Sequence, residues 1–154
     1  MSEDSGTSHT RNPVMDGAPV HAPSRFDGAN PFWQALDGGT LRLPRCPTCN
    51  AWQWYPLPVC GSCRAAEPEW VDVPDYGTVF TFTTVHRSFL PEGAVTPPYN
   101  VGLITLDGVD GPRLVSVLTG CGEGEPFVGM PVRMELLDLG THRLPVFVPA
   151  GATQ

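Results

Sequence analysis

Four cysteines in two closely spaced pairs are the residues of this chain with the clearest capacity for chemistry. They lie in the stretch CPTCNAWQWYPLPVCGSC, in which ten residues separate two Cys-x-x-Cys pairs. A tight turn within each pair, the second one helped by Gly61, can bring all four thiolates to one tetrahedral ion. The spacing therefore predicts a single metal site whose ligands are Cys46, Cys49, Cys60 and Cys63.

The ligand set also indicates which metal is bound and what it does. Zinc is the expected ion, and iron in a rubredoxin-like site, which uses the same four thiolates, is the alternative. Four thiolates fill a tetrahedral shell, whereas a catalytic zinc keeps one position open for water or substrate. We therefore expect a structural metal, whose binding supplies folding free energy to a segment too short to bury a core.

Three further residues are candidates for binding a cofactor or a partner. Trp54 lies with Trp52 and Tyr55 on the loop between the cysteine pairs, where aromatic side chains either pack on the cluster or form a platform for an adenine ring or a partner surface. His86 and Arg87 end a predicted strand, where they are either solvated or placed to meet a phosphate or acidic groups of a partner.

The rest of the chain offers little for catalysis, and no catalytic residue is predicted. All nine basic residues are Arg, which excludes a lysine Schiff-base mechanism. Cys121 has no basic neighbour in the sequence that would lower its thiol pKa, and His142 is expected in a surface loop. The loop 90–98, with three prolines, is either an inert connection or a preordered binding element.

Composition and charge narrow the class of protein. The chain has 154 residues, 18 of them Pro and 17 Gly, which favours short strands and turns over long helices. A net charge of -7 opposes attraction to the phosphates of nucleic acids. The sequence predicts no membrane span and no signal peptide, so we expect a cytoplasmic location, where paired cysteines bind metals more often than they form disulfides.

The pattern of apolar residues predicts a mainly β fold in two parts. We expect an N-terminal tail (1–29), a short helix with the zinc ribbon (30–73), a barrel (74–150) and a C-terminal tail (151–154). The helix begins near Asn30 and is followed by a strand at 40–43. Five strands with a long connection after the first favour an OB-type barrel over an open sandwich. These strands are expected at residues 77–87, 99–108, 113–120, 131–139 and 144–150.

The order of these motifs resembles a family of acyl-CoA-associated proteins that join a rubredoxin-like zinc ribbon to an OB-fold. The resemblance is carried by PFWQAL, the two cysteine pairs, EWVDVPDYGTVFTFTTVHR, PPYNVGLITLDG, VGMPVRMEL and LPVFVPA, and it covers residues 31–150. The chain departs from the family pattern at Leu57 and Val148, where the family often has a basic residue.

This resemblance implies an accessory role. The chain is expected to be a noncatalytic subunit of a hetero-oligomer with a thiolase-like, lipid-transfer-protein-type enzyme that acts on acyl-CoA thioesters. A retro-aldol lyase of steroid side-chain degradation is the first expectation, and an acyltransferase or ketothiolase complex is the alternative. A single-stranded nucleic-acid-binding protein is a separate alternative, which the fold allows and the net charge opposes.

Overall fold

The computed structural model describes residues 29–65, 67–87, 97–121, 126–138 and 143–151. Four sequence-based predictions fall outside these ranges: the tail 1–29 apart from Ala29, the loop 90–98 up to residue 96, His142, and the tail 151–154 apart from Gly151. No helix among the described residues is long and apolar enough to cross a membrane.

The helix α1 (Asn30–Asp37) begins where the sequence predicts it. Pro31 lies in its first turn, where a missing backbone N–H costs no hydrogen bond. The helix ends at Gly38, whose backbone N–H still donates to the carbonyl of Gln34 at 3.1 Å. Phe32 and its neighbours on one face are buried, so α1 is amphipathic and must pack against another element.

The cysteine-rich segment lies between the two strands of a small antiparallel sheet. Strand β1 (Leu41–Arg45) pairs with β2 (Glu69–Val73) along its full length, and Arg42 forms an ion pair with Asp72 across the two strands. The sequence analysis predicted β1 but missed β2. This strand is short and carries acidic residues at two of five positions, which weakens the strand pattern.

The remaining strands form a closed barrel, which confirms the predicted OB-type fold. Their order around the barrel is β3-β4-β5-β7-β6, and all neighbouring pairs are antiparallel except β5 and β7. The observed bounds differ from the predicted ones by at most two residues at each end. The strands are β3 (Tyr76–Val85), β4 (Tyr99–Leu106), β5 (Leu114–Leu118), β6 (Pro131–Asp138) and β7 (Arg143–Pro149).

The barrel core follows from the alternation of side chains along each strand. Every second residue points inward, so one residue set is buried while its neighbours stay partly exposed. A fully buried Val, Leu, Ile or Phe stabilises the fold by about 1.5–3 kcal/mol relative to an exposed one. The centre of the barrel is filled by Val79, Ile104, Leu114, Leu118, Val132 and Phe147.

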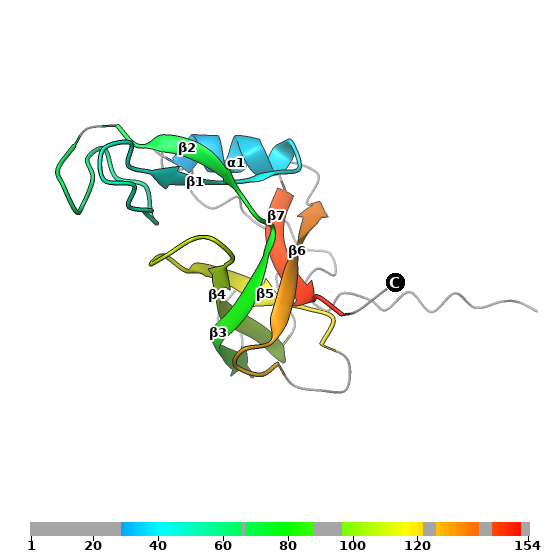
Figure 1. The fold of residues 1–154 in the computed structure, drawn as a ribbon. Coiled ribbons are helices and arrows are strands. Elements are labelled where there is room, and N and C mark those ends of the chain that lie inside the picture. The colour runs from blue at the N-terminus through cyan, green and yellow to red at the C-terminus, as the bar shows by residue number, and fades with distance from the viewer. Residues whose placement is uncertain (1–28, 66, 88–96, 122–125, 139–142, 152–154) are drawn as a thin grey trace, which may run out of the picture.

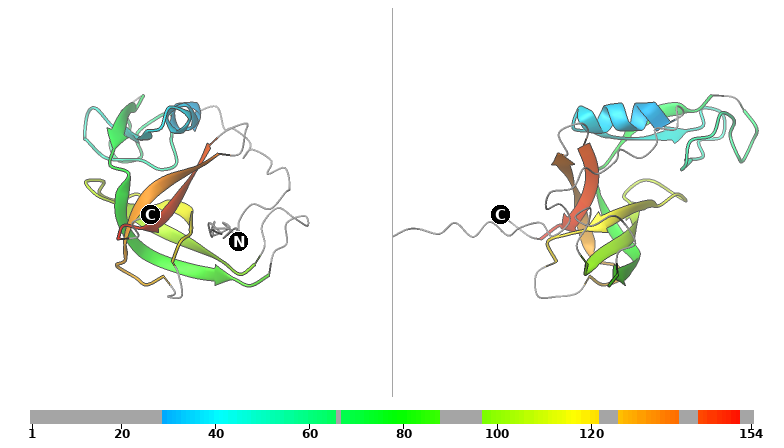
Figure 2. Two further views of the ribbon diagram at one scale, coloured as in Figure 1. Left: turned by 90° about the vertical axis from the view of Figure 1, so that its right-hand side faces the viewer. Right: turned by 180° about the vertical axis from the view of Figure 1, so that it is seen from behind.

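Helix α1 joins the ribbon to the barrel. It contacts both β1 and β7, and Figures 1 and 2 show it lying with the β1–β2 sheet at one end of the barrel. Arg143 at the start of β7 donates two hydrogen bonds to Asp37, one from its backbone and one from its guanidinium, each 3.3 Å long. The ribbon is therefore held beside the barrel end at which β7 begins.

Candidate metal centre

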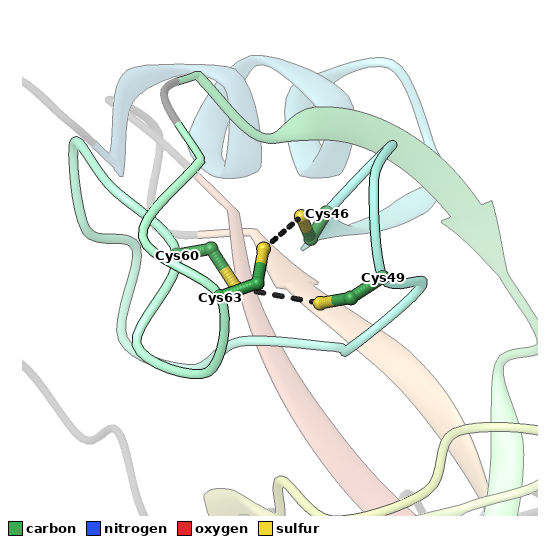
Figure 3. A group of neighbouring side chains, drawn as sticks. All are labelled: Cys46, Cys49, Cys60 and Cys63. Carbon is green, nitrogen blue, oxygen red and sulfur yellow. Dashed lines mark hydrogen bonds between the residues drawn. The ribbon is translucent and has the colours of Figure 1, made fainter.

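The four predicted ligands meet at one point. Their Sγ atoms all lie within 4.8 Å of one another, and the separations Cys46–Cys63 and Cys49–Cys60 are both 3.6 Å (Figure 3). A tetrahedral ion with Zn–S distances of about 2.3 Å has S···S separations of about 3.8 Å. The cluster therefore has the dimensions of a tetrathiolate site. A disulfide, with an S–S distance of about 2.05 Å, joins none of these thiols.

The two cysteine pairs are built alike, and we call the turns 46–50 and 60–64 the first and second knuckle. In the first knuckle the N–H of Asn50 donates to the carbonyl of Cys46 at 2.9 Å. In the second knuckle the N–H of Arg64 donates to the carbonyl of Cys60 at 3.0 Å. Two equivalent turns thus present two thiols each to the same point.

The residue that closes each knuckle has a left-handed backbone. Asn50 has φ 61° and Arg64 has φ 65°, a region that non-glycine residues rarely adopt and that Asn tolerates best. Gly61 is not among the residues with positive φ, and a Cβ added there would meet no atom within 4 Å. The expectation that Gly61 helps the second turn close was therefore wrong, because the turn bends at Arg64.

Backbone N–H groups aim at three of the sulfurs. The N–H groups of Cys63 and Ser62 lower the pKa of Cys60 to about 6, and the N–H of Ser62 lies 3.4 Å from its Sγ. The N–H of Cys49 lowers the pKa of Cys46 in the same way. For Cys49 the N–H of Ala51 acts to lower the pKa, but burial and the three neighbouring sulfurs raise it to about 12. Fixed donors thus favour thiolates at the two buried cysteines.

The loop between the knuckles, residues 51–59, packs its tryptophans inward. Trp54 meets Phe32 of α1 in a tilted contact, at 4.6 Å between ring centroids, and stacks on Tyr55 at 5.0 Å. Trp52 lies under the guanidinium of Arg45 at 5.1 Å. Both tryptophans contact the hydrophobic core, whereas Tyr55 is 67% exposed. Cofactor binding by Trp54 stays a prediction.

His86 and Arg87 lie directly after β3 and are both exposed. Among the described residues, no hydrogen bond, ion pair or ring contact joins either of them to Trp54. The three candidate cofactor-binding residues therefore do not form one site by direct contact. Cys121 is partly buried, and that burial raises the pKa of its thiol, which opposes a nucleophilic role.

Two family models match consecutive parts of the chain. One is described as the rubredoxin-like zinc ribbon domain of ChsH2 and matches residues 33–69. The other is described as the C-terminal OB-fold domain of ChsH2 and matches residues 70–137. Together they cover about two thirds of the chain, and the boundary between them falls at the start of β2, a few residues before the barrel begins at β3.

Two solved structures have the same fold. One, described as an Ltp2-ChsH2(DUF35) aldolase, has a TM-score of 0.75 and 29% identity, and the match covers 84% of this chain and 99% of that chain. The other, a DUF35-family protein of unknown function from Sulfolobus solfataricus, is 17% identical with a TM-score of 0.55, covering 79% of this chain and 84% of that one.

A curated relative from Thermomonospora curvata, a probable enoyl-CoA hydratase alpha subunit, is 32% identical over 123 residues. The match takes in 79% of this chain but only 37% of the relative, so the chain spans less than half of that protein's length.

The two matched family models agree with the structure, in which the clustered cysteines precede the barrel. The chain belongs to the ChsH2 family, in which a rubredoxin-like zinc ribbon precedes a C-terminal OB-fold domain.

Proposed function

We propose that this chain is a noncatalytic accessory subunit that binds a thiolase-like, lipid-transfer-protein-type enzyme acting on acyl-CoA thioesters. The observation that carries the proposal is the match to 99% of a chain in the solved Ltp2-ChsH2(DUF35) aldolase, at a TM-score of 0.75. The name of that structure joins ChsH2 to a second component, Ltp2, in one aldolase. A chain with the same fold over this length is suited to the same kind of assembly.

The chemistry of the described side chains supports a noncatalytic role. The chain has no Lys, and its four clustered thiols would fill the tetrahedral shell of one ion. The fifth thiol, Cys121, has a raised pKa, and it donates to the carbonyl of Thr119 at 3.8 Å, which is not a base that could activate it. The reacting groups of the assembly are accordingly assigned to the partner.

The metal is proposed to be zinc, held by Cys46, Cys49, Cys60 and Cys63. Bound zinc would supply folding free energy and no reaction step. Its effect would reach beyond the knuckles, because the loop between them carries Trp54 onto α1. We propose the domain division at residues 73 and 74, with helix and ribbon before it and the barrel after it.

Acyl-CoA is proposed to be bound mainly by the partner. A site for the phosphates of CoA would need free cationic side chains, but most described arginines already contact this chain's own groups. Val148, where the family often has a basic residue, is buried in β7. The arginines so engaged are Arg42 with Asp72, Arg45 with Trp52, Arg113 with Phe80, Arg133 with Glu135 and Arg143 with Asp37.

The reaction we favour for the complex is retro-aldol cleavage in steroid side-chain degradation, in the cytoplasm. An acyltransferase or ketothiolase complex is the alternative within the same class. A second candidate is association with an enoyl-CoA hydratase, which is favoured by the 32% identity to the probable hydratase alpha subunit. In that relative most of the chain lies outside the match, so hydration would belong to the other part.

Affinity capture tests the proposal. The tagged chain is recovered from its native cells, the co-purifying chains are identified by mass spectrometry, and the complex is assayed for retro-aldol cleavage and for hydration of acyl-CoA thioesters. We expect a stoichiometric thiolase-like chain and activity that requires both chains. Recovery of the chain alone, or turnover by the purified chain alone, would disprove the accessory role. A co-purifying hydratase would select the second candidate.

A further inference from the structure

A groove at the junction of ribbon and barrel is not explained by the metal centre. It has a volume of about 250 Å³ and lies between α1, the loop 51–59, β5 and β7. Figures 1 and 2 show α1 above the end of the barrel at which β7 begins. Its walls include five aromatic side chains and no charged residue. The aromatic residues are Phe32, Trp33, Trp54, Tyr55 and Phe147.

The groove exists because the barrel is incompletely paired between β5 and β7. In this parallel pair only Leu118 and Phe147 are matched within the described strands, and the N–H of Thr119 donates to the carbonyl of Phe147 at 2.9 Å. Two residues towards the N-terminus on each strand, the same register would place Ser116 beside Pro145. The carbonyl of Val115 would then need the N–H of residue 145.

Pro145 has no N–H to offer, so the ladder stops there. The carbonyl of Pro145 is instead bonded by the hydroxyl of Ser116 at 2.8 Å. In this register Val115, the next residue on that edge of β5, receives no ladder hydrogen bond from Pro145, and both residues line the groove. An open strand edge offers main-chain hydrogen bonds that an added peptide segment can complete.

The aromatic wall reaches from the core to the rim. Trp33 meets Phe32 edge-on at 5.1 Å, Phe32 meets Trp54 at 4.6 Å, and Trp54 stacks on Tyr55 at 5.0 Å. At the rim, Tyr55 is 67% exposed and Val115 is 58% exposed. Rigid aromatic groups with an apolar valine opposite are the composition of an interface core and not of a solvated surface.

Size and charge decide what kind of occupant fits. Pockets for whole small molecules are usually about 300–1,000 Å³, so this groove is small for a CoA ester but has room for one or two large side chains. Its walls carry no cation that would meet phosphates. An acyl chain, moreover, has nothing to bond with the open edge of β5, whereas a peptide backbone does.

We propose that this groove receives an uncharged, extended segment of the partner enzyme, whose aromatic or branched aliphatic side chain inserts between Tyr55 and Val115. The proposal rests on the accessory-subunit function proposed above and names the surface through which it operates. The backbone of the inserted segment pairs with β5 beside Val115, and Tyr55 covers its side chain.

The test uses the partner chain that co-purifies with the wild-type protein, itself purified, as the probe in a binding titration. Two groove variants are compared with matched variants elsewhere. Val115→Glu is paired with Val128→Glu, a valine that is 65% exposed in the turn before β6, and Tyr55→Ala is paired with Tyr76→Ala, a tyrosine that is 51% exposed on β3. Zinc content and circular dichroism verify that each variant folds.

We expect Val115→Glu and Tyr55→Ala to weaken binding by about tenfold or more, and the matched variants to change it by less than about twofold. If the groove and control variants bind the partner equally well, the proposal that the groove is the docking site would be overturned, and the accessory role would be left intact. Absence of any co-purifying chain would overturn both. Binding of octanoyl-CoA to this chain alone, in competition with the partner and lost in Val115→Glu, would show that the occupant is an acyl chain and overturn the proposal.

Discussion

At the scale of single residues, Cys49 and Cys121 have different surroundings. A comparison of the two therefore distinguishes metal binding from general thiol chemistry. Cys49 belongs to the quartet of sulfurs within 4.8 Å of one another, whereas Cys121 lies in the barrel with the carbonyl of Thr119 as its neighbour. The two cysteines therefore make a matched pair for substitution, because the same change is expected to have different consequences at the two positions.

We expect Cys49→Ser to lose zinc and most of the order of the ribbon, because a tetrathiolate site without one ligand loses both affinity and the folding free energy coupled to it. Cys121→Ser should keep about one zinc per chain. Metal content by elemental analysis and circular dichroism of the two purified variants are the measurements. Full zinc content in Cys49→Ser would contradict the ligand assignment.

The knuckle turns give a second prediction at the residue scale. Arg64 and Asn50 occupy equivalent positions, with φ of 65° and 61° respectively. In this left-handed region of backbone angles the Cβ is crowded, and Asn tolerates the left-handed backbone better than Arg does. Arg64→Asn is therefore expected to stabilise the zinc-loaded protein by about 0.5–1 kcal/mol. Urea unfolding measures the change. The reciprocal variant Asn50→Arg should destabilise by a similar amount, and a stabilising effect there would refute the argument.

At the scale of elements, the pairing of β3 with β4 depends on a glycine. A Cβ added at Gly77 would lie 2.0 Å from the carbonyl oxygen of Thr105 and 2.9 Å from the Cα of Leu106, and both are backbone atoms that cannot turn aside. In contrast, a Cβ at Gly61 in the second knuckle meets nothing within 4 Å. Glycine is thus required in the strand and not in the knuckle.

Gly77→Ala should therefore lower the free energy of unfolding by about 2 kcal/mol or more, since the strands must move apart. Gly61→Ala is expected to change it by less than about 0.5 kcal/mol. Chemical denaturation monitored by the four tryptophans compares the two variants. Equal stabilities would mean that the barrel absorbs the added methyl group by a small backbone shift.

At the scale of the whole molecule, the net charge argues against nucleic-acid binding, although zinc ribbons and OB-folds both bind nucleic acids in other proteins. The chain has a net charge of -7, and most of its described arginines are paired with its own groups. Binding to a phosphate backbone normally requires free cations that displace counterions.

We expect no binding to a single-stranded oligonucleotide of about 20 bases at about 0.15 M salt and micromolar protein. Fluorescence anisotropy of a labelled oligonucleotide makes the measurement, with a basic OB-fold protein as the positive control. An anisotropy increase that strengthens as salt is lowered would restore nucleic acid as the partner.

The fold class and the cysteine cluster could be predicted from the amino-acid sequence alone. Both follow from local patterns: Cys-x-x-Cys turns need only a few residues, and strand alternation is visible along one segment at a time. Five barrel strands were therefore predicted close to their bounds. The strand β2 was missed, because its short, partly acidic sequence becomes a strand only through pairing with β1.

The packing of the aromatic residues, and the residues that close the turns, could be read only from the folded chain. Trp54 meets Phe32 from a different segment, and the groove opens where Pro145 fails to pair beside Val115. Likewise, the bend of the second knuckle lies at Arg64 and not at Gly61. The physical reason is the same in each case: these features depend on contacts between distant segments, or on backbone angles that residue type alone does not fix.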